Sequence, residues 1–159
     1  MIRSICDLCD DHPDLVQVAE PVFTEYGGVR SFHGPITTIR CHEDNLLLKT
    51  TLATPGRGRV MVVDGGGSLR KALFGDVLAG LAVQHGWAGV IINGAVRDVE
   101  NTRDMPVGVR ALAACPRRPL QSGAGERDVA VSFAGVDFAP GMYAYADLNG
   151  LIVSTRALG

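Results

Sequence analysis

Two aspartates and an arginine in the middle of the chain, Asp76, Arg97 and Asp98, have side chains suited to metal-assisted chemistry. The Asp98 carboxylate is a hard oxygen ligand for Mg²⁺ or Mn²⁺, cations that often keep several waters. Arg97 offers a planar fork of donors for a carboxylate or a keto oxygen, and Asp76 can hold a water that moves a proton. A divalent cation on a 2-keto acid stabilises the enolate that forms when a carbon–carbon bond breaks. These residue types are compatible with metal-assisted chemistry of this kind.

The segments around these residues predict a strand, a glycine loop, a helix and a second strand. Residues 59–64 and 88–93 are short apolar runs typical of strands buried on both faces. Gly65-Gly66-Gly67 follows the first run, a helix is expected over residues 75–85, and residues 94–98 are expected to form a loop after the second strand. A right-handed crossover of this kind makes the two strands parallel.

The carboxyl ends of parallel strands share one edge of a sheet, where ligands of open α/β sheets usually bind. We therefore expect the Gly65-Gly66-Gly67 loop and the loop of residues 94–98 to meet beside the start of the helix at residues 75–78. Backbone N–H groups at a helix N-terminus favour a substrate carboxylate. The predicted site thus combines free backbone donors with one guanidinium and two carboxylates.

The same residues also admit structural roles. Arg97 and Asp98 could be an ion pair that fixes a loop, Asp76 could be a first-turn acid that favours the helix dipole, and Gly65-Gly66-Gly67 could be only a tight turn. The glycine loop lacks the third small residue of a dinucleotide fingerprint. A methyltransferase that uses S-adenosylmethionine would be expected to begin with a Rossmann unit and to have a longer chain.

The rest of the chain predicts a mixed α/β fold that is richer in strands in its second half. A helix is expected over residues 4–11, because Ser4 is a good N-cap and Pro13 follows its end. Leucines within residues 43–52 give a second helix an apolar face. The Asn149-Gly150 turn predicts a hairpin. The expected extended segments are residues 16–23, 35–41, 107–115, 128–133, 143–146 and 151–154.

Size and composition fit a single domain that spans residues 1–159. Hydrophobic residues make up 47% and charged residues 20%, so the chain can bury a core without cross-links. The net charge is −2, and Lys49 and Lys71 are the only lysines, which argues against direct nucleic acid binding. No apolar run reaches about 18 residues and the start lacks a signal-peptide pattern, so we expect a cytoplasmic protein without a membrane partner.

The cysteines and histidines give little sign of a metal site. Cys6 and Cys9 have the spacing of a metal or redox pair, but Cys41 and His42 are adjacent and make a poor second pair of ligands. The N-terminal cysteines are instead expected to be small buried thiols on a helix. The scattered histidines are expected to be structural or exposed, and Trp87 is expected to pack in the core.

Eight stretches, in order along the chain, are Glu20-Pro21, Phe23, Tyr26-Gly27-Gly28, Cys41-His42-Glu43-Asp44-Asn45, Gly56-Arg57-Gly58-Arg59-Val60, Val63-Asp64-Gly65-Gly66-Gly67-Ser68, Leu81-Ala82-Val83-Gln84 and Gly94-Ala95-Val96-Arg97. Together they resemble the family of the bacterial regulator of ribonuclease activity A. The resemblance runs from about Cys6 to Ser154, and such a long ordered set is more specific than any single motif. It implies a layered β/β/α sandwich of the swivelling-domain type and a homotrimer.

The catalytic members of this family resemble class II aldolases, which cleave 4-hydroxy-4-methyl-2-oxoglutarate to pyruvate and also decarboxylate oxaloacetate. Their motif is an Asp, twenty residues and then Arg-Asp, and Asp76 with Arg97-Asp98 fits it. The resemblance implies that Arg97 binds the keto acid, Asp98 holds Mg²⁺ or Mn²⁺ and Asp76 positions a proton-transfer water. The backbone amides implied to bind substrate are those of Gly75, Asp76, Val77 and Leu78.

Two other functions stay open from the sequence. Family members that inhibit ribonuclease E through protein contacts can lack the acid after the arginine, whereas this chain keeps Asp98. A protein-binding regulator of a ribonuclease E-type endonuclease is therefore the main alternative to a lyase. A domain that binds a sugar or an acid without chemistry is the third reading.

Overall fold

The computed structural model describes residues 3–159 of the chain. The helices are α1 (Ile5–Asp11), α2 (Leu46–Leu52), α3 (Asp76–Gln84) and α4 (Val99–Thr102). The strands are β1 (Val16–Val18), β2 (Thr24–Glu25), β3 (Phe32–Arg40), β4 (Val60–Asp64), β5 (Ala72–Phe74), β6 (Gly89–Val96), β7 (Gly108–Ala114), β8 (Glu126–Arg127), β9 (Val131–Phe133), β10 (Val136–Phe138), β11 (Tyr143–Asp147) and β12 (Gly150–Ser154). The main sheet follows the order β1-β12-β11-β3-β4-β6-β7-β2, with β5 beside β6 and β8 beside β3.

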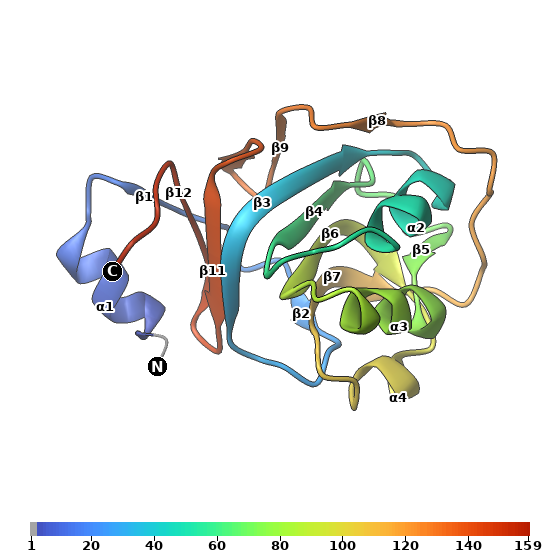
Figure 1. Cartoon of the computed structure of the whole chain (residues 1–159), viewed down its shortest axis with the longest axis horizontal. Helices are drawn as coiled ribbons and strands as arrows, with labels where there is room; N and C mark the ends of the chain where they lie inside the picture. Colours follow the sequence, from blue (N-terminus) through green and yellow to red (C-terminus); the bar gives the residue numbers. More distant parts are fainter. Residues whose placement is uncertain (1–2) are drawn as a thin grey trace.

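The elements form layers around the parallel strands β3, β4, β6 and β7, which confirms the predicted mixed α/β sandwich (Figure 1). Helices α2 and α3 cover one face, while the β9–β10 hairpin and the antiparallel strands β11 and β12 pack toward the other. Strand β4 illustrates this arrangement, because its successive side chains point to opposite faces of the sheet. Val60 and Val62 join the core on the hairpin side, and Met61 and Val63 join the core under the helices. All four are fully buried, as the continuous apolar run predicts.

The predicted crossover is confirmed, with one strand added. Strands β4 and β6 are parallel, and α3 lies between them in the chain. Strand β5, which the sequence analysis missed, precedes α3 and pairs with the far end of β6. The expectation of a loop from residue 94 was therefore wrong for its first residues. Ala95 is flanked by Ala72 of β5 and Ala113 of β7, so residues 94–96 continue the strand.

Two helix starts show how local chemistry sets the boundaries. Helix α1 begins as predicted, with the Ser4 hydroxyl accepting a hydrogen bond from the Cys6 N–H at 3.1 Å. Helix α2 begins at Leu46 rather than at residue 43. Glu43 has a φ of 55°, which ends any helical path before Asn45, the N-cap residue.

The predicted hairpin of β11 and β12 is confirmed, but two other strands are shorter than expected. Strand β1 covers only residues 16–18 of the predicted 16–23. Strand β9 starts at Val131 because Asp128 has a φ of 60°, which interrupts an extended chain. Trp87 is buried as predicted, and its indole N–H donates to the carbonyls of Leu52 and Thr54, each at 3.1 Å.

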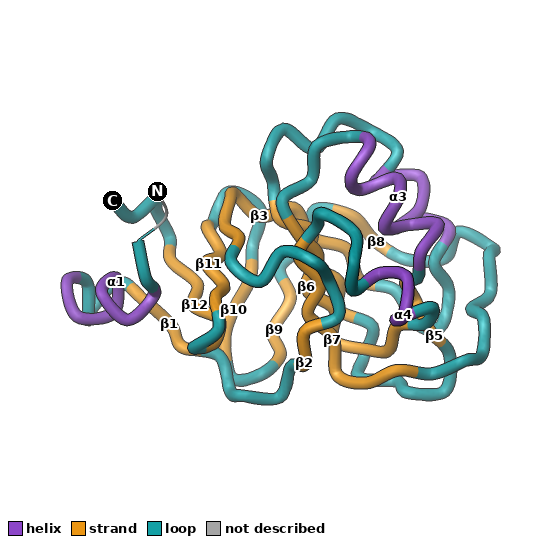
Figure 2. Tube along the Cα trace, turned by 90° about the horizontal axis from the view of Figure 1, so that it is seen from below, coloured by secondary structure: helices purple, strands orange, loops and turns teal. Residues whose placement is uncertain are grey.

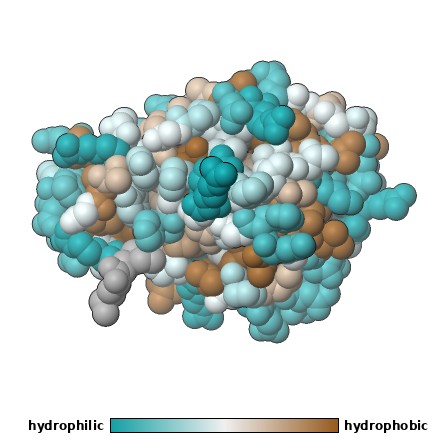
Figure 3. All heavy atoms as spheres, in the orientation of Figure 1, coloured by the Kyte–Doolittle hydropathy of each residue, from teal (hydrophilic) through white to brown (hydrophobic). Residues whose placement is uncertain are grey.

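The helices occupy opposite ends of the molecule. Figure 2 shows α1 beside both termini, at the end away from α3 and α4. Helix α1 packs through Ile5 and Leu8 on Tyr145 and Ile152 of the β11–β12 hairpin. On the face drawn in Figure 3, apolar atoms occur as separate patches among hydrophilic ones. Within residues 3–159, no helix has the length and apolarity needed to cross a bilayer.

Candidate functional site

The six residues singled out from the sequence line one cavity of about 160 Å³. It lies at the carboxyl end of β6, next to β5 and the first turn of α3, where the crossover argument places a ligand. The lining residues are Asn45, Lys49, Ala72, Phe74, Gly75, Asp76, Val77, Leu78, Arg97, Asp98, Pro119 and Gln121.

The start of α3 gives the cavity its backbone donors. Gly75 is the N-cap residue, and the first helical hydrogen bond runs from the Ala79 N–H to the Gly75 carbonyl at 2.9 Å. The amides of the first turn have no partner inside a helix, so those of Asp76, Val77 and Leu78 can serve a ligand. Leu78 is buried in the core and anchors this turn, whereas the Val77 side chain is 63% exposed.

Arg97 and Asp98 follow directly after β6. The Arg97 N–H donates to the carbonyl of Phe74 at 2.9 Å, which ties the end of β6 to the end of β5. Asp98 then adopts a φ of 55°, and its carbonyl accepts the N–H groups of Asn101 and Thr102, each at 3.0 Å. Nε of Arg97 lies 3.9 Å from Oδ2 of Asp98, and both side chains are partly exposed. These backbone hydrogen bonds place the Cα atoms of both residues at the edge of the cavity.

The two carboxylates of the cavity influence each other. Burial raises the pKa of Asp98, the negative charge of Asp76 raises it further, and Arg97 partly offsets both. Oδ2 of Asp76 also accepts a hydrogen bond from the Asn101 side-chain amide at 3.0 Å. A divalent cation would neutralise the negative charge that builds up where these two carboxylates converge.

The site fits a cation that takes only part of its shell from the protein. Across residues 3–159, no group of three or more His, Cys, Asp or Glu side chains is arranged to hold a metal ion. Mg²⁺ does not need such a cage, because it is commonly held by one or two carboxylates while water and substrate oxygens fill the other positions. Asp98, about 40% exposed, leaves room for those ligands.

The glycine loop does not belong to the cavity, which corrects the prediction that its amides are free. The N–H groups of Gly65 and Gly67 donate to the carbonyl of Asn93 at 3.1 and 3.0 Å, and that of Gly66 donates to the Asp64 carboxylate. Gly66 and Gly67 have positive φ values of 68° and 74°, so the run forms a tight turn. Strand β5 takes the place next to the cavity that had been expected for this loop.

Asn45 is a cavity residue that sequence reasoning missed. Its side-chain amide donates to the carbonyl of Leu73 at 3.0 Å, while its Oδ1 is buried and has no hydrogen-bond partner within the described residues. A buried acceptor of this kind calls for a water or a ligand donor. Asn45 stands in one of the stretches that carry the family resemblance, but its place in this cavity depends on the long-range hydrogen bond to Leu73 of β5.

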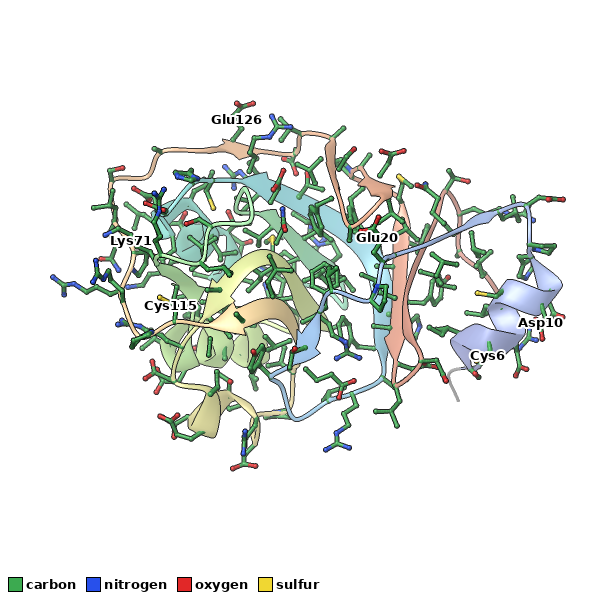
Figure 4. All side chains as sticks on the ribbon, turned by 180° about the vertical axis from the view of Figure 1, so that it is seen from behind. Cys6, Asp10, Glu20, Lys71, Cys115 and Glu126 are labelled. Atoms are coloured by element: carbon green, nitrogen blue, oxygen red, sulfur yellow. The ribbon has the colours of Figure 1, made fainter. Side chains whose placement is uncertain are left out.

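The N-terminal cysteines lie far from this cavity. Figure 4 shows Cys6 and Asp10 at one end of the molecule and Lys71 and Cys115 at the other. The expectation of buried thiols was wrong for Cys6, which is exposed, and Cys9 is only half-buried. Helix α1 turns just one side toward the sheet, and Ile5 and Leu8 occupy it.

The chain matches known proteins over nearly its whole length. A family model described as RraA-like, Aldolase/RraA, matches residues 5–153. A protein of Ectopseudomonas mendocina (strain ymp), named as a candidate 4-hydroxy-4-methyl-2-oxoglutarate aldolase, is 55% identical over 152 residues, 96% of this chain and 94% of the relative. A protein of Xanthomonas campestris pv. campestris (strain 8004) with the same name is 56% identical and covers 96% and 91%.

Two solved structures superpose closely on the whole chain. The RNA-processing inhibitor RraA from Thermus thermophilis has a TM-score of 0.96 and 42% identity, covering 100% of this chain and 96% of that one. A protein from Geobacillus kaustophilus HTA426, described as an S-adenosylmethionine:2-dimethylmenaquinone methyltransferase, also has a TM-score of 0.96, with 47% identity and coverage of 98% and 97%. One fold thus carries three different functional descriptions, and the chemistry of the cavity must decide among them.

Proposed function

The chain belongs to the RraA-like Aldolase/RraA family, and on this premise we propose that it is a divalent-metal-dependent lyase. The proposed reaction is cleavage of 4-hydroxy-4-methyl-2-oxoglutarate to pyruvate, with decarboxylation of oxaloacetate as a side activity. The observation that carries the proposal is the meeting of Asp76, Arg97 and Asp98 in one cavity beside the first turn of α3. The names of the relatives support the same reaction class.

In this proposal Asp98 holds Mg²⁺ or Mn²⁺. Its carboxylate is a hard ligand, and a cation there would neutralise the charge that accumulates where Asp76 approaches Asp98. When bound, the cation supplies Lewis-acid polarisation of the substrate's keto group.

The first turn of α3 and Arg97 orient the keto acid. The free amides at the N-terminus of α3 bind the carboxylate on C1, because they point their N–H groups at the cavity in the positive field of the helix end. The Arg97 guanidinium stabilises the negative charge that grows on the C2 oxygen as the bond breaks. The Arg97 backbone is held in place before substrate arrives, since its N–H donates to the Phe74 carbonyl.

Bond breaking requires one proton to leave and one to arrive. When the C3–C4 bond breaks, the C4 hydroxyl loses its proton and C4 becomes the carbonyl carbon of one pyruvate, while C3 gains a proton and becomes the methyl group of the other. Asp76, held by the Asn101 amide, positions the water that carries these protons. The free Oδ1 of Asn45 offers an acceptor for a hydroxyl or a water in the same cavity.

Pyruvate release tests the proposal directly. Purified protein is assayed with 4-hydroxy-4-methyl-2-oxoglutarate and with oxaloacetate, with Mg²⁺ or Mn²⁺, with EDTA, and as the Asp98→Ala variant. We expect turnover that needs the metal and falls by at least about a hundredfold in the variant. Turnover no faster than free metal alone, in a folded protein, would reject the lyase.

The similarity to an RNA-processing inhibitor favours a second function on a different surface. As a homotrimer, the chain would bind a ribonuclease E-type endonuclease through protein contacts and lower its activity. The test is co-purification of the chain with the endonuclease, together with RNA cleavage assays, and sedimentation gives the oligomeric state. Asp98→Ala should still inhibit if this surface is separate from the cavity, and absence of any association would exclude the regulator.

A further inference from the structure

A second cleft, with a volume of about 460 Å³, adjoins the candidate site. Its charged lining residues are all cationic, and they are Lys71, Arg97, Arg117 and Arg118. Arg97, Pro119 and Gln121 line both this cleft and the cavity that contains Asp76 and Asp98, so the two hollows lie side by side. We call the second hollow the cationic cleft.

Of the four cations of the cationic cleft, only Arg97 has a carboxylate of the described residues within ion-pair distance, that of Asp98 at 3.9 Å. Within residues 3–159, no carboxylate lies within ion-pair distance of Lys71, Arg117 or Arg118. The neighbouring Arg70 behaves differently, because its Nε lies 2.8 Å from Oε2 of Glu43. Unpaired cations gathered in a concave surface attract an anionic ligand.

The backbone around the cationic cleft is fixed. The Arg117 carbonyl accepts the Ala72 N–H at 2.8 Å, which holds the arginine segment against the start of β5. Leu120 forms two backbone hydrogen bonds with the segment that precedes α2. Its N–H donates to the Glu43 carbonyl, and its carbonyl accepts the Asn45 N–H. The buried Asp44 carboxylate then accepts the Ser122 N–H at 2.8 Å. These hydrogen bonds hold the backbone that carries the two exposed arginines in place beside the cleft.

We propose that the cationic cleft binds the second carboxylate of a dicarboxylic 2-keto acid, with Arg117 and Arg118 as the residues that set this specificity. The inference rests on the proposed function, because the C1 carboxylate and keto group must occupy the adjoining cavity. Arg97 stands at the boundary of the two hollows. A keto acid with its C2 oxygen at Arg97 therefore extends its C4 end into the cleft, where a carboxylate meets guanidinium groups suited to it.

Binding of uncleaved keto acids tests the cleft without relying on turnover. Calorimetric titrations with Mg²⁺ present compare 2-oxoglutarate with 2-oxopentanoate, which lacks the second carboxylate. The native protein is expected to bind 2-oxoglutarate about 10–100 times more tightly, and Arg117→Ala/Arg118→Ala should remove most of this preference. Arg127→Ala, an exposed arginine outside both hollows, is the charge control. Equal affinities for the two acids, or no binding of either, would overturn the inference.

Turnover separates failure of the cleft from failure of the lyase. The paired substrates are 4-hydroxy-4-methyl-2-oxoglutarate and 4-hydroxy-4-methyl-2-oxopentanoate, in which a methyl group replaces the second carboxylate. The ratio of their kcat/KM values should fall about 10–100-fold in Arg117→Ala/Arg118→Ala and recover in large part in Arg117→Lys/Arg118→Lys. An unchanged ratio in an active enzyme would refute the cleft alone. A native protein that cleaves neither substrate would refute the proposed function. The titrations would still test whether the cleft binds the second carboxylate.

Discussion

Gly75 and Asp98 lie so close together that a Cβ atom on residue 75 would stand 3.1 Å from Oδ2 of Asp98. The same atom would also lie 3.3 Å from the Arg97 carbonyl oxygen. The φ of Gly75 is −160°, an extended value open to any residue, so space rather than backbone freedom requires glycine. The Asp98 carboxylate thus packs directly against Gly75, the N-cap residue of α3.

Gly75→Ala should therefore disturb the site with little effect on folding. The new methyl group would push the Asp98 carboxylate aside, and displacements of this size cost about 10–100-fold in kcat/KM. Mn²⁺ affinity, followed by the paramagnetic signal of free Mn²⁺, should fall in parallel. Gly80→Ala in the same helix is the matched control, because its Cβ would meet nothing closer than Met105 Cε at 3.9 Å. If both variants behave alike, the contact with Asp98 is unimportant.

The hydrogen bond from Asn101 to Asp76 should matter for proton transfer more than for binding. Asn101→Ala would free the Asp76 carboxylate to rotate, so we expect kcat to fall about 3–10-fold while KM changes little. Asn101→Asp would place a like charge beside Asp76 and should lower kcat further. Steady-state kinetics on both variants decide the matter, and a rise in KM alone would show that Asn101 serves binding instead.

Asp44 should make folding stability depend on acid pH. Burial by itself would raise the pKa of this carboxyl, but hydrogen bonds from Ser122, Leu46 and Gly123 outweigh burial and lower it below the ordinary 3.8. Because the folded-state pKa is depressed, the carboxylate stabilises the fold above the ordinary value and loses this effect as pH falls through the folded value. Asp44→Asn should cost about 1–3 kcal/mol near neutral pH.

Urea unfolding at several pH values measures this effect. The difference in unfolding free energy between the native chain and Asp44→Asn should be constant near neutrality and shrink below about pH 4, the ordinary range for an aspartate. Asp128→Asn, which changes an exposed aspartate, controls for loss of charge alone. A difference that stayed constant into strong acid would show that the charge of Asp44 contributes nothing.

The cysteines should differ sharply in reactivity. Burial raises the pKa of the Cys41 thiol to about 12, with further contributions from the charges of Asp44 and Asp64. Only thiolates react readily, so Cys41 should resist iodoacetamide at about pH 8 while the exposed Cys6 is labelled. Peptide mass mapping before and after denaturation checks this. Early labelling of Cys41 in the folded chain would mean that α2 opens on the time scale of the reaction.

The sequence by itself determined the unit that carries the site. The apolar runs of β4 and β6 and the helix between them are local patterns, and the handedness rule for crossovers made the strands parallel. Asp76 and Arg97 therefore had to arrive at one edge of the sheet, even though 20 residues separate them. The topology argument predicts only that these residues lie together, and the family resemblance implies the role of each.

Only the tertiary structure decided what surrounds that unit. Strand β5 is three residues long and is defined by its pairing with β6, so no periodicity marks it. The amides of the glycine loop were expected to be free, but they donate to the Asn93 carbonyl and to the Asp64 carboxylate. Asn45 reaches the cavity, and Arg117 the cationic cleft, through hydrogen bonds to residues far away in the chain, Leu120 and Ala72. Long-range pairing of this kind depends on which segments become neighbours, and that information is absent from any local pattern of residues.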